Sequence, residues 1–151
     1  VGKALKDSAT ILLVTGAGGI FGKILQNSDI AGMLGEALTQ SSIGIFLPFL
    51  LAAALKSAQG SSTVALITTA SVIAPLMATL GFTSEMDKAM VVVAIGAGSL
   101  VVSHVNDSFF WVVTQMSGMD VKTGYKLHTT GTFIIGTTAM IALYLMFCFF
   151  H

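Results

Sequence analysis

The chain has 151 residues, of which 54% are hydrophobic and only 9% are charged. Soluble domains carry about 25% charged residues to solvate their surface, so this composition excludes an ordinary soluble protein and indicates an all-α protein embedded in a lipid bilayer. The 7 Lys and Arg residues balance the 7 Asp and Glu residues, so there is no basic surface to attract a nucleic acid and such a partner is excluded as well.

The first apolar stretch, residues 8–22, contains a glycine-rich run that is followed by Lys23. Its spacing does not match a phosphate-binding loop, because no Ser or Thr follows the lysine, and it does not match a dinucleotide fingerprint. Gly18 and Gly22 lie four residues apart, a spacing that lets two membrane helices approach closely. Residues 28–41 have apolar side chains at helical spacing, which predicts an amphipathic helix at the membrane interface.

Two short apolar arms with a polar segment between them come next. Residues 43–55 are too few to cross a bilayer, which takes about 20 helical residues, and Pro48 is expected to bend them. A polar octet, residues 56–63, separates this arm from the apolar residues 64–80. This pattern predicts a re-entrant hairpin, whose polar tip lies at membrane depth where it lines a protein or water cavity.

A broken helix and an intact one complete the chain. Residues 89–102 are apolar, residues 103–108 are polar, and residues 109–113 are apolar again. This order predicts a membrane helix with an unwound hinge, where polar side chains satisfy the freed backbone or hold a ligand. A polar loop at residues 119–126 then leads to residues 130–150, which are long and apolar enough to span the bilayer.

Lys56 is the only charged residue between Glu36 and Glu85. A cation at membrane depth needs a counter-charge, and the carboxylate of a small anionic substrate would supply one, with backbone amides of the tip as further donors. The alternative is that Lys56 extends to the membrane surface from a shallower position.

The rest of the tip offers amide, hydroxyl and backbone groups that match the hydroxyls of a polyol acid, and Gly60 permits close backbone approach. The hydroxyls also have a structural use, since Ser61 or Ser62 is typical of a helix N-cap. A helix N-terminus capped in this way attracts an anion, so the two roles are compatible. The candidate substrate-binding residues of the tip are Lys56, Gln59, Gly60, Ser61, Ser62 and Thr63.

His104 and Asp107 are the titratable residues of the hinge. Both are candidate proton-coupling residues, because a carboxyl in a low dielectric or an imidazole exchanges a proton near neutral pH. In the structural alternative, Asp107 caps a helix that begins at Ser108, and Asn106 holds the unwound backbone. Ser103, His104 and Asn106 complete the candidate substrate-binding set.

Ser103, His104 and Asp107 have the residue types of a hydrolytic triad, but no nucleophile elbow surrounds the serine, and three neighbours on one hinge cannot face one another as a triad does. We therefore expect no enzymatic activity. We expect neither a metal site nor a cofactor, because no further ligands are close in the sequence. His128 and His151 flank the last helix and are interpreted as membrane-interface residues.

Three segments resemble the gluconate permease family, the proton symporters for gluconate and related sugar acids, which include D-serine permease relatives. They are TGAGGIFGKIL at residues 15–25, LKSAQGSSTVALITT at residues 55–69 and SHVNDSFFW at residues 103–111. At the tip, this sequence has Lys56 where Arg is frequent in the family and Ser62 where Ala is frequent.

The resemblance implies that residues 1–151 form a single membrane region, the C-terminal third of a transporter with two inverted repeats. This third would supply one re-entrant hairpin, one broken helix and the closing helix, and would need the remainder of the chain to complete the ligand site. The implied function is proton-coupled symport of gluconate or a related sugar acid across the bacterial inner membrane, by a multi-pass protein whose partners are the anion, protons and the bilayer. A homo-oligomer is left open.

Two other functions are compatible with the same residues. In a sodium-coupled carboxylate transporter of this architecture, Asn106, Ser61 and hinge carbonyls would coordinate Na⁺. A non-transporting membrane subunit is the second alternative, although such a subunit would not need a cation at the tip together with titratable groups at the hinge.

Overall fold

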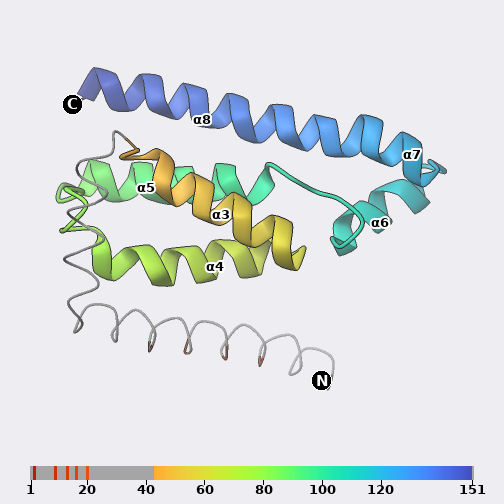
Figure 1. The fold of residues 1–151 in the computed structure, drawn as a ribbon, viewed down its shortest axis with the longest axis horizontal. Helices are drawn as coiled ribbons and strands as arrows, with labels where there is room; N and C mark the ends of the chain where they lie inside the picture. The colour runs from red at the N-terminus through yellow and green to blue at the C-terminus, as the bar shows by residue number, and fades with distance from the viewer. Residues whose placement is uncertain are drawn as a thin grey trace.

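The structure, a computed structural model, describes residues 43–150 and five residues ahead of them, Gly2, Ala9, Leu13, Gly16 and Ile20. Every regular element of residues 43–150 is a helix (Figure 1), which confirms the predicted all-α class. The amphipathic helix predicted for residues 28–41 lies outside the described residues, as does most of the glycine-rich run.

The two short apolar arms form a helical hairpin. Helix α3 covers Phe46–Gln59, and helix α4 covers Ser62–Ile73 and continues into the 3₁₀ turn η1, Ala74–Leu76. Pro48 lies in the first turn of α3, where a proline costs no hydrogen bond, so α3 continues past it to Gln59 instead of bending there.

The tip of this hairpin is shorter than the predicted polar octet. Gly60 ends α3 with a left-handed φ of 73° and donates its N–H to the carbonyl oxygen of Lys56 at 2.8 Å. Ser61 begins α4 as its N-cap, because its Oγ accepts the N–H of Val64 at 3.3 Å. A C-cap and an N-cap at adjacent residues reverse the chain, so only Gly60 and Ser61 are non-helical.

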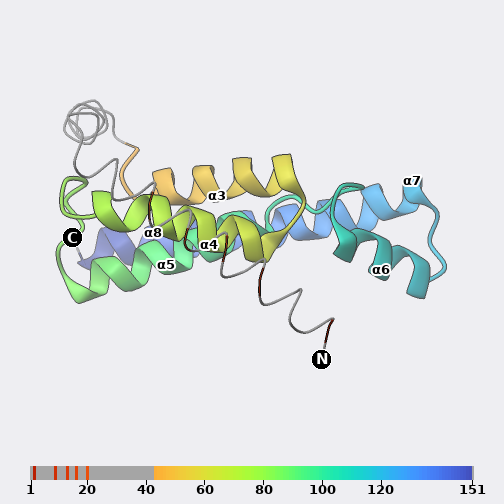
Figure 2. The same cartoon turned by 90° about the horizontal axis from the view of Figure 1, so that it is seen from below.

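Helix α5, Glu85–Leu100, packs along α3 (Figures 1 and 2). Ser84 and Asp87 begin α5 with a capping box. The packing is close because α5 has small residues on this face: a Cβ atom at Gly98 would overlap the carbonyl oxygen of Phe49, as is typical of membrane helix crossings. The buried apolar core lies mainly among α3, α4, α5 and the last helix and consists of Ile45, Ala52, Ile73, Phe82, Met90, Val91, Ala94, Ile95, Met140 and Leu143.

The predicted break follows α5. Residues 101–107 are non-helical, and helix α6 covers Ser108–Met116; the segment 101–107 is called the hinge below. The break therefore begins two residues earlier than the sequence predicted. In Figure 1 the hinge passes the tip of the α3–α4 hairpin, and α6 lies beyond the ends of these helices.

The last part of the chain is one continuous helix with a π-helical turn near its start. Helix α7, Val121–Gly124, leads into the π turn η2, Tyr125–Thr129, and then into helix α8, Thr130–Phe150. Residues 121–150 are long and apolar enough to cross a membrane, and α8 has the bounds predicted from the sequence. The predicted loop at residues 119–126 is shorter than expected, because Asp120 caps α7 and helix begins at Val121.

Candidate functional site

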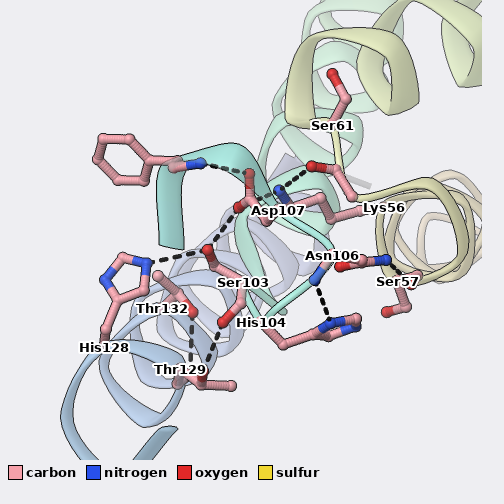
Figure 3. Close-up of polar contacts among 12 residues, drawn as sticks. Lys56, Ser57, Ser61, Ser103, His104, Asn106, Asp107, His128, Thr129 and Thr132 are labelled. Carbon is pink, nitrogen blue, oxygen red and sulfur yellow. Dashed lines mark hydrogen bonds and ion pairs between the residues drawn. The ribbon is translucent and has the colours of Figure 1, made fainter. Parts of the chain in front are cut away.

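An ion pair joins the hairpin to the hinge. Lys56 lies in the last turn of α3, and its Nζ donates to Oδ2 of Asp107 at 2.5 Å (Figure 3). The two side chains are only 1% and 7% exposed. Lys56 therefore does not extend to a surface, and its counter-charge in this structure comes from the chain itself. The predicted need for a partner is met 51 residues away in the sequence.

Asp107 is held from three sides. Its Oδ2 accepts hydrogen bonds from Lys56 and from the hydroxyl of Ser103, the latter at 2.5 Å. Its Oδ1 accepts the N–H of Phe109 at 3.0 Å, so Asp107 is also the N-cap of α6. The structural alternative considered for Asp107, the cap of the helix that begins at Ser108, is thus confirmed as one of its roles.

The tip and the hinge are in direct contact. Gly60 packs against the backbone of Asn106 so closely that an added Cβ would overlap the Asn106 carbonyl oxygen. The side-chain amide of Asn106 donates to the carbonyl oxygen of Ser57 in α3 at 2.8 Å. Asn106 therefore fastens the hinge to the hairpin, whereas the sequence assigned it to the unwound backbone of the hinge.

His128 extends this network to the last helix. Its Nε2 lies 3.0 Å from Oγ of Ser103 (Figure 3), and the next residue, Thr129, donates its hydroxyl to the carbonyl oxygen of Ser103 at 2.5 Å. The ring of His128 also contacts the rings of Phe109 and Phe110, with centroids 5.6 and 5.9 Å apart. Three separate parts of the chain, α3, the hinge and the π turn, thus share one set of hydrogen bonds.

The sequence predicted further residues for this site, but they lie around the network and do not join it. The ring of His104 accepts the N–H of Asn106 through Nδ1 at 3.5 Å, and only its backbone carbonyl bonds to Asp107, at 2.8 Å. Gln59 is exposed at the end of α3, and Ser62 and Thr63 line an open hollow of about 330 Å³ beside α5.

Sequence reasoning missed His128. The sequence analysis interpreted it, together with His151, as a membrane-interface residue that flanks the last helix. Its use depends on the π turn, which the sequence did not predict. The signal that could have found it is the general rule that an ionisable residue within or next to a span is a functional candidate.

The network has the composition of a site for a small charged ligand and protons. It contains one cation, one carboxylate and a hydroxyl, which are buried, and one imidazole, which is half-buried. Within residues 43–150, no three side chains of His, Cys, Asp or Glu come together as a metal site would require.

Comparison with known proteins places these residues in a family context. A family model described as GntP family permease matches residues 1–149. The inner membrane permease YgbN of Escherichia coli strain K12 is 38% identical over 143 residues, the low-affinity gluconate transporter of the same strain is 40% identical over 141 residues, and its D-serine transporter DsdX is 35% identical over 139 residues. The matches cover 93%, 93% and 91% of this chain but 31% of each relative, so the chain spans about a third of their length. No solved structure matches it.

Proposed function

Because this chain belongs to the GntP family of permeases, we propose that it is the C-terminal part of a bacterial inner-membrane transporter that carries gluconate or a related sugar acid together with protons. The family consists of permeases and not of enzymes. Two of the named relatives transport gluconate or D-serine, and both compounds have a carboxylate and at least one hydroxyl. A cation that recognises a carboxylate is therefore the expected common element of the ligand site.

The helix lengths support a re-entrant hairpin. The 14 residues of α3 rise about 21 Å at 1.5 Å each, and the 12 residues of α4 rise less, whereas the hydrocarbon core is about 30 Å thick. Neither arm is long enough to cross the bilayer alone. The tip would then lie inside the membrane, next to the break in the α5–α6 helix, as in transporters built from inverted repeats.

The buried pair of Lys56 and Asp107 is the observation that carries this proposal. A buried ion pair contributes little net stability compared with apolar residues of the same size, so stability alone does not explain why the tip and the hinge each have a charge. An exchange of partners by Lys56 explains both charges. A substrate carboxylate is the same chemical group as the side chain of Asp107 and competes with it for the ammonium of Lys56.

Protonation of Asp107 decides this competition. When Asp107 takes up a proton, it loses its charge, and Lys56 becomes free to bind the anion. When Asp107 releases the proton, it returns to Lys56 and displaces the anion. Proton and substrate therefore bind together and leave together, which is the linkage that a symporter requires.

The remaining tip residues would recognise the polyol part of the substrate. The N-terminus of α4, with Ser61 as its cap, points a positive dipole end at the tip. Ser62 and Thr63 line the hollow beside α5 together with Ser99. We propose that these groups, with Gln59 and the backbone of Gly60, contact substrate hydroxyls, and that Ser103, His104 and Asn106 complete the site from the hinge.

Uptake by the full-length protein in reconstituted vesicles tests the proposal. Radiolabelled gluconate uptake is measured with an inward pH gradient, acid outside, in one set of vesicles and with an inward Na⁺ gradient at equal pH in another. We expect accumulation above the equilibrium level with the pH gradient alone. Accumulation that requires Na⁺ would instead support the sodium-coupled alternative, and no accumulation of gluconate or D-serine under either gradient would contradict transport of a small carboxylate.

A further inference from the structure

We propose that His128 is the residue that delivers protons to Asp107, through the hydroxyl of Ser103. This inference deepens the proposed function and rests on it, because it assigns the route of the coupled proton. It arises from a continuous chain of hydrogen bonds, from Lys56 to Asp107 to Ser103 to His128 (Figure 3).

The direction of each hydrogen bond follows from the number of protons available. An ionised carboxylate only accepts, so Ser103 donates its single hydroxyl proton to Oδ2 of Asp107 at 2.5 Å. Oγ of Ser103 is then left as an acceptor toward His128, 3.0 Å away. Nε2 of His128 must therefore bear the proton of that bond. The Nε2 proton of His128 is therefore directed toward Asp107, and the hydroxyl of Ser103 lies between the two residues.

The transfer balances with no further reactant. His128 in its imidazolium form passes the Nε2 proton to Oγ of Ser103 as the Ser103 hydroxyl proton moves to Oδ2 of Asp107. His128 ends neutral, Asp107 ends as a neutral carboxylic acid, and Ser103 has one hydroxyl proton before and after. The opposite sequence of transfers returns the proton. Imidazole suits this use because it has two ring nitrogens and can either donate from both or accept at one of them.

The charged and titratable groups around His128 are few. The hinge presents Asp107 through Ser103, and α3 presents Lys56 behind Asp107. The π turn itself has Tyr125 and Lys126, both exposed, and α6 faces the ring with Phe109 and Phe110. The remaining titratable residue of the hinge, His104, bonds through its ring to Asn106 and not to this chain of groups.

His128 is also the least buried member of this chain of groups. Its ring lines an open hollow of about 370 Å³ together with Leu100, Phe109, Leu127, Gly131 and Thr132, whereas Asp107 and Ser103 are buried. His128 is thus the member of the chain of groups that reaches space outside the packed site. It belongs to a π-helical turn, an insertion that is frequent at functional sites.

The test compares gradient-driven uptake with exchange in the full-length protein in vesicles. His128→Gln keeps a side chain that can donate to Ser103 but cannot change its charge. Loss of a positioned proton-transfer group commonly slows a reaction about 100-fold or more. Because conformational steps limit many such cycles, we expect uptake of radiolabelled gluconate driven by a pH gradient to fall by at least about tenfold, while exchange of internal for external gluconate at equal pH stays within about twofold.

Three further variants make the outcome decisive. Lys126→Gln removes a charge from the same π turn on its exposed side and should keep gradient-driven uptake. Ser103→Ala breaks the route between His128 and Asp107 and should also lower gradient-driven uptake by at least about tenfold, which decides the matter if the His128→Gln protein does not fold. Gradient-driven uptake that persists in both His128→Gln and Ser103→Ala would overturn the proposal, and so would a loss confined to His104→Gln.

These results are separable from failure of the proposed function. If wild-type vesicles accumulate no gluconate with a pH gradient, proton symport itself is contradicted. If wild-type vesicles do so and His128→Gln behaves like wild type across pH 5 to 8, only the route through His128 is wrong.

Discussion

Replacing Asp107 by Asn removes the counter-charge of Lys56 while leaving a side chain of nearly the same shape. Lys56 is 1% exposed, so its ammonium cannot be solvated in place, and its other hydrogen bond is a 3.5 Å contact to Gly60. Removing one partner of a buried ion pair costs about 3–5 kcal/mol. We therefore expect Asp107→Asn to lower stability by about 3–5 kcal/mol.

Two comparisons separate this effect from general damage to the hinge. In the double variant, Lys56→Gln with Asp107→Asn, no unpaired charge remains, so most of the lost stability should return. In the single variant, gluconate offers Lys56 a replacement carboxylate with no competition from Asp107. Thermal unfolding of the detergent-solubilised full-length protein should therefore show a larger stabilisation by gluconate in Asp107→Asn than in wild type, and little in the double variant.

The effect of the same variant on transport tests the proposed role of Asp107 as the carboxyl that binds the coupled proton. An amide cannot load or release a proton, so accumulation driven by a pH gradient should vanish while exchange of gluconate persists. The reasoning would be refuted by gradient-driven accumulation in Asp107→Asn, or by equal protection of the single and double variants by gluconate.

Three further predictions concern the tip and the closing helix. Gly60→Ala should destabilise the tip by several kcal/mol because its Cβ would overlap the hinge backbone. The control is Gly118→Ala, which has a similar φ of 67° but open space around it and should cost only about 1–2 kcal/mol. Equal losses of stability in thermal unfolding would argue against tight packing of the tip. Lys56→Arg should retain much of the gluconate affinity that Lys56→Gln loses, as measured by ligand-induced stabilisation, and an unchanged affinity in the Gln variant would exclude pairing with the carboxylate. Hydrogen bonds from the side chain and backbone of Thr123 lower the pKa of Asp120 below its ordinary 3.8. The stability that Asp120 contributes is therefore complete above about pH 4 and is lost as the pH falls through the pKa of Asp120 in the folded protein. Asp120→Asn should abolish this part of the acid unfolding curve, and a variant curve identical to that of the wild type would disprove the prediction.

The sequence predicted the hairpin, the hinge and the last helix because each depends on local composition. Charges are rare in this chain, so their positions divide it into apolar segments whose lengths decide which of them can cross a bilayer. Thr130–Phe150 was predicted with its observed bounds for this reason. The extent of the tip was overestimated, since polarity alone does not distinguish the helical Lys56 from the cap residues Gly60 and Ser61.

The partners within the site were not predictable in the same way. Lys56 and Asp107 are 51 residues apart, and nothing local to either residue identifies the other. The contact of His128 with Ser103 was also not predictable from the sequence, because the π turn at residues 125–129 determines where the His128 ring lies relative to Ser103. Pairing of distant charges and a local irregularity of helix geometry are both results of tertiary packing, which overrides local preference.

The position of the ion pair affects how the tip of the hairpin could open toward one side of the membrane or the other. Lys56 belongs to the hairpin and Asp107 to the hinge, so the pair joins two elements that must separate if the tip is to open toward one side. Two further contacts hold the same elements together, the Asn106 amide on Ser57 and the packing of Gly60 against the Asn106 backbone. Both are short-range and uncharged, whereas the ion pair alone depends on protonation and on a competing anion. If this pair binds the ligand as proposed, it would therefore also set the free-energy cost of opening the tip, and an empty transporter with Asp107 ionised would be the one held closed.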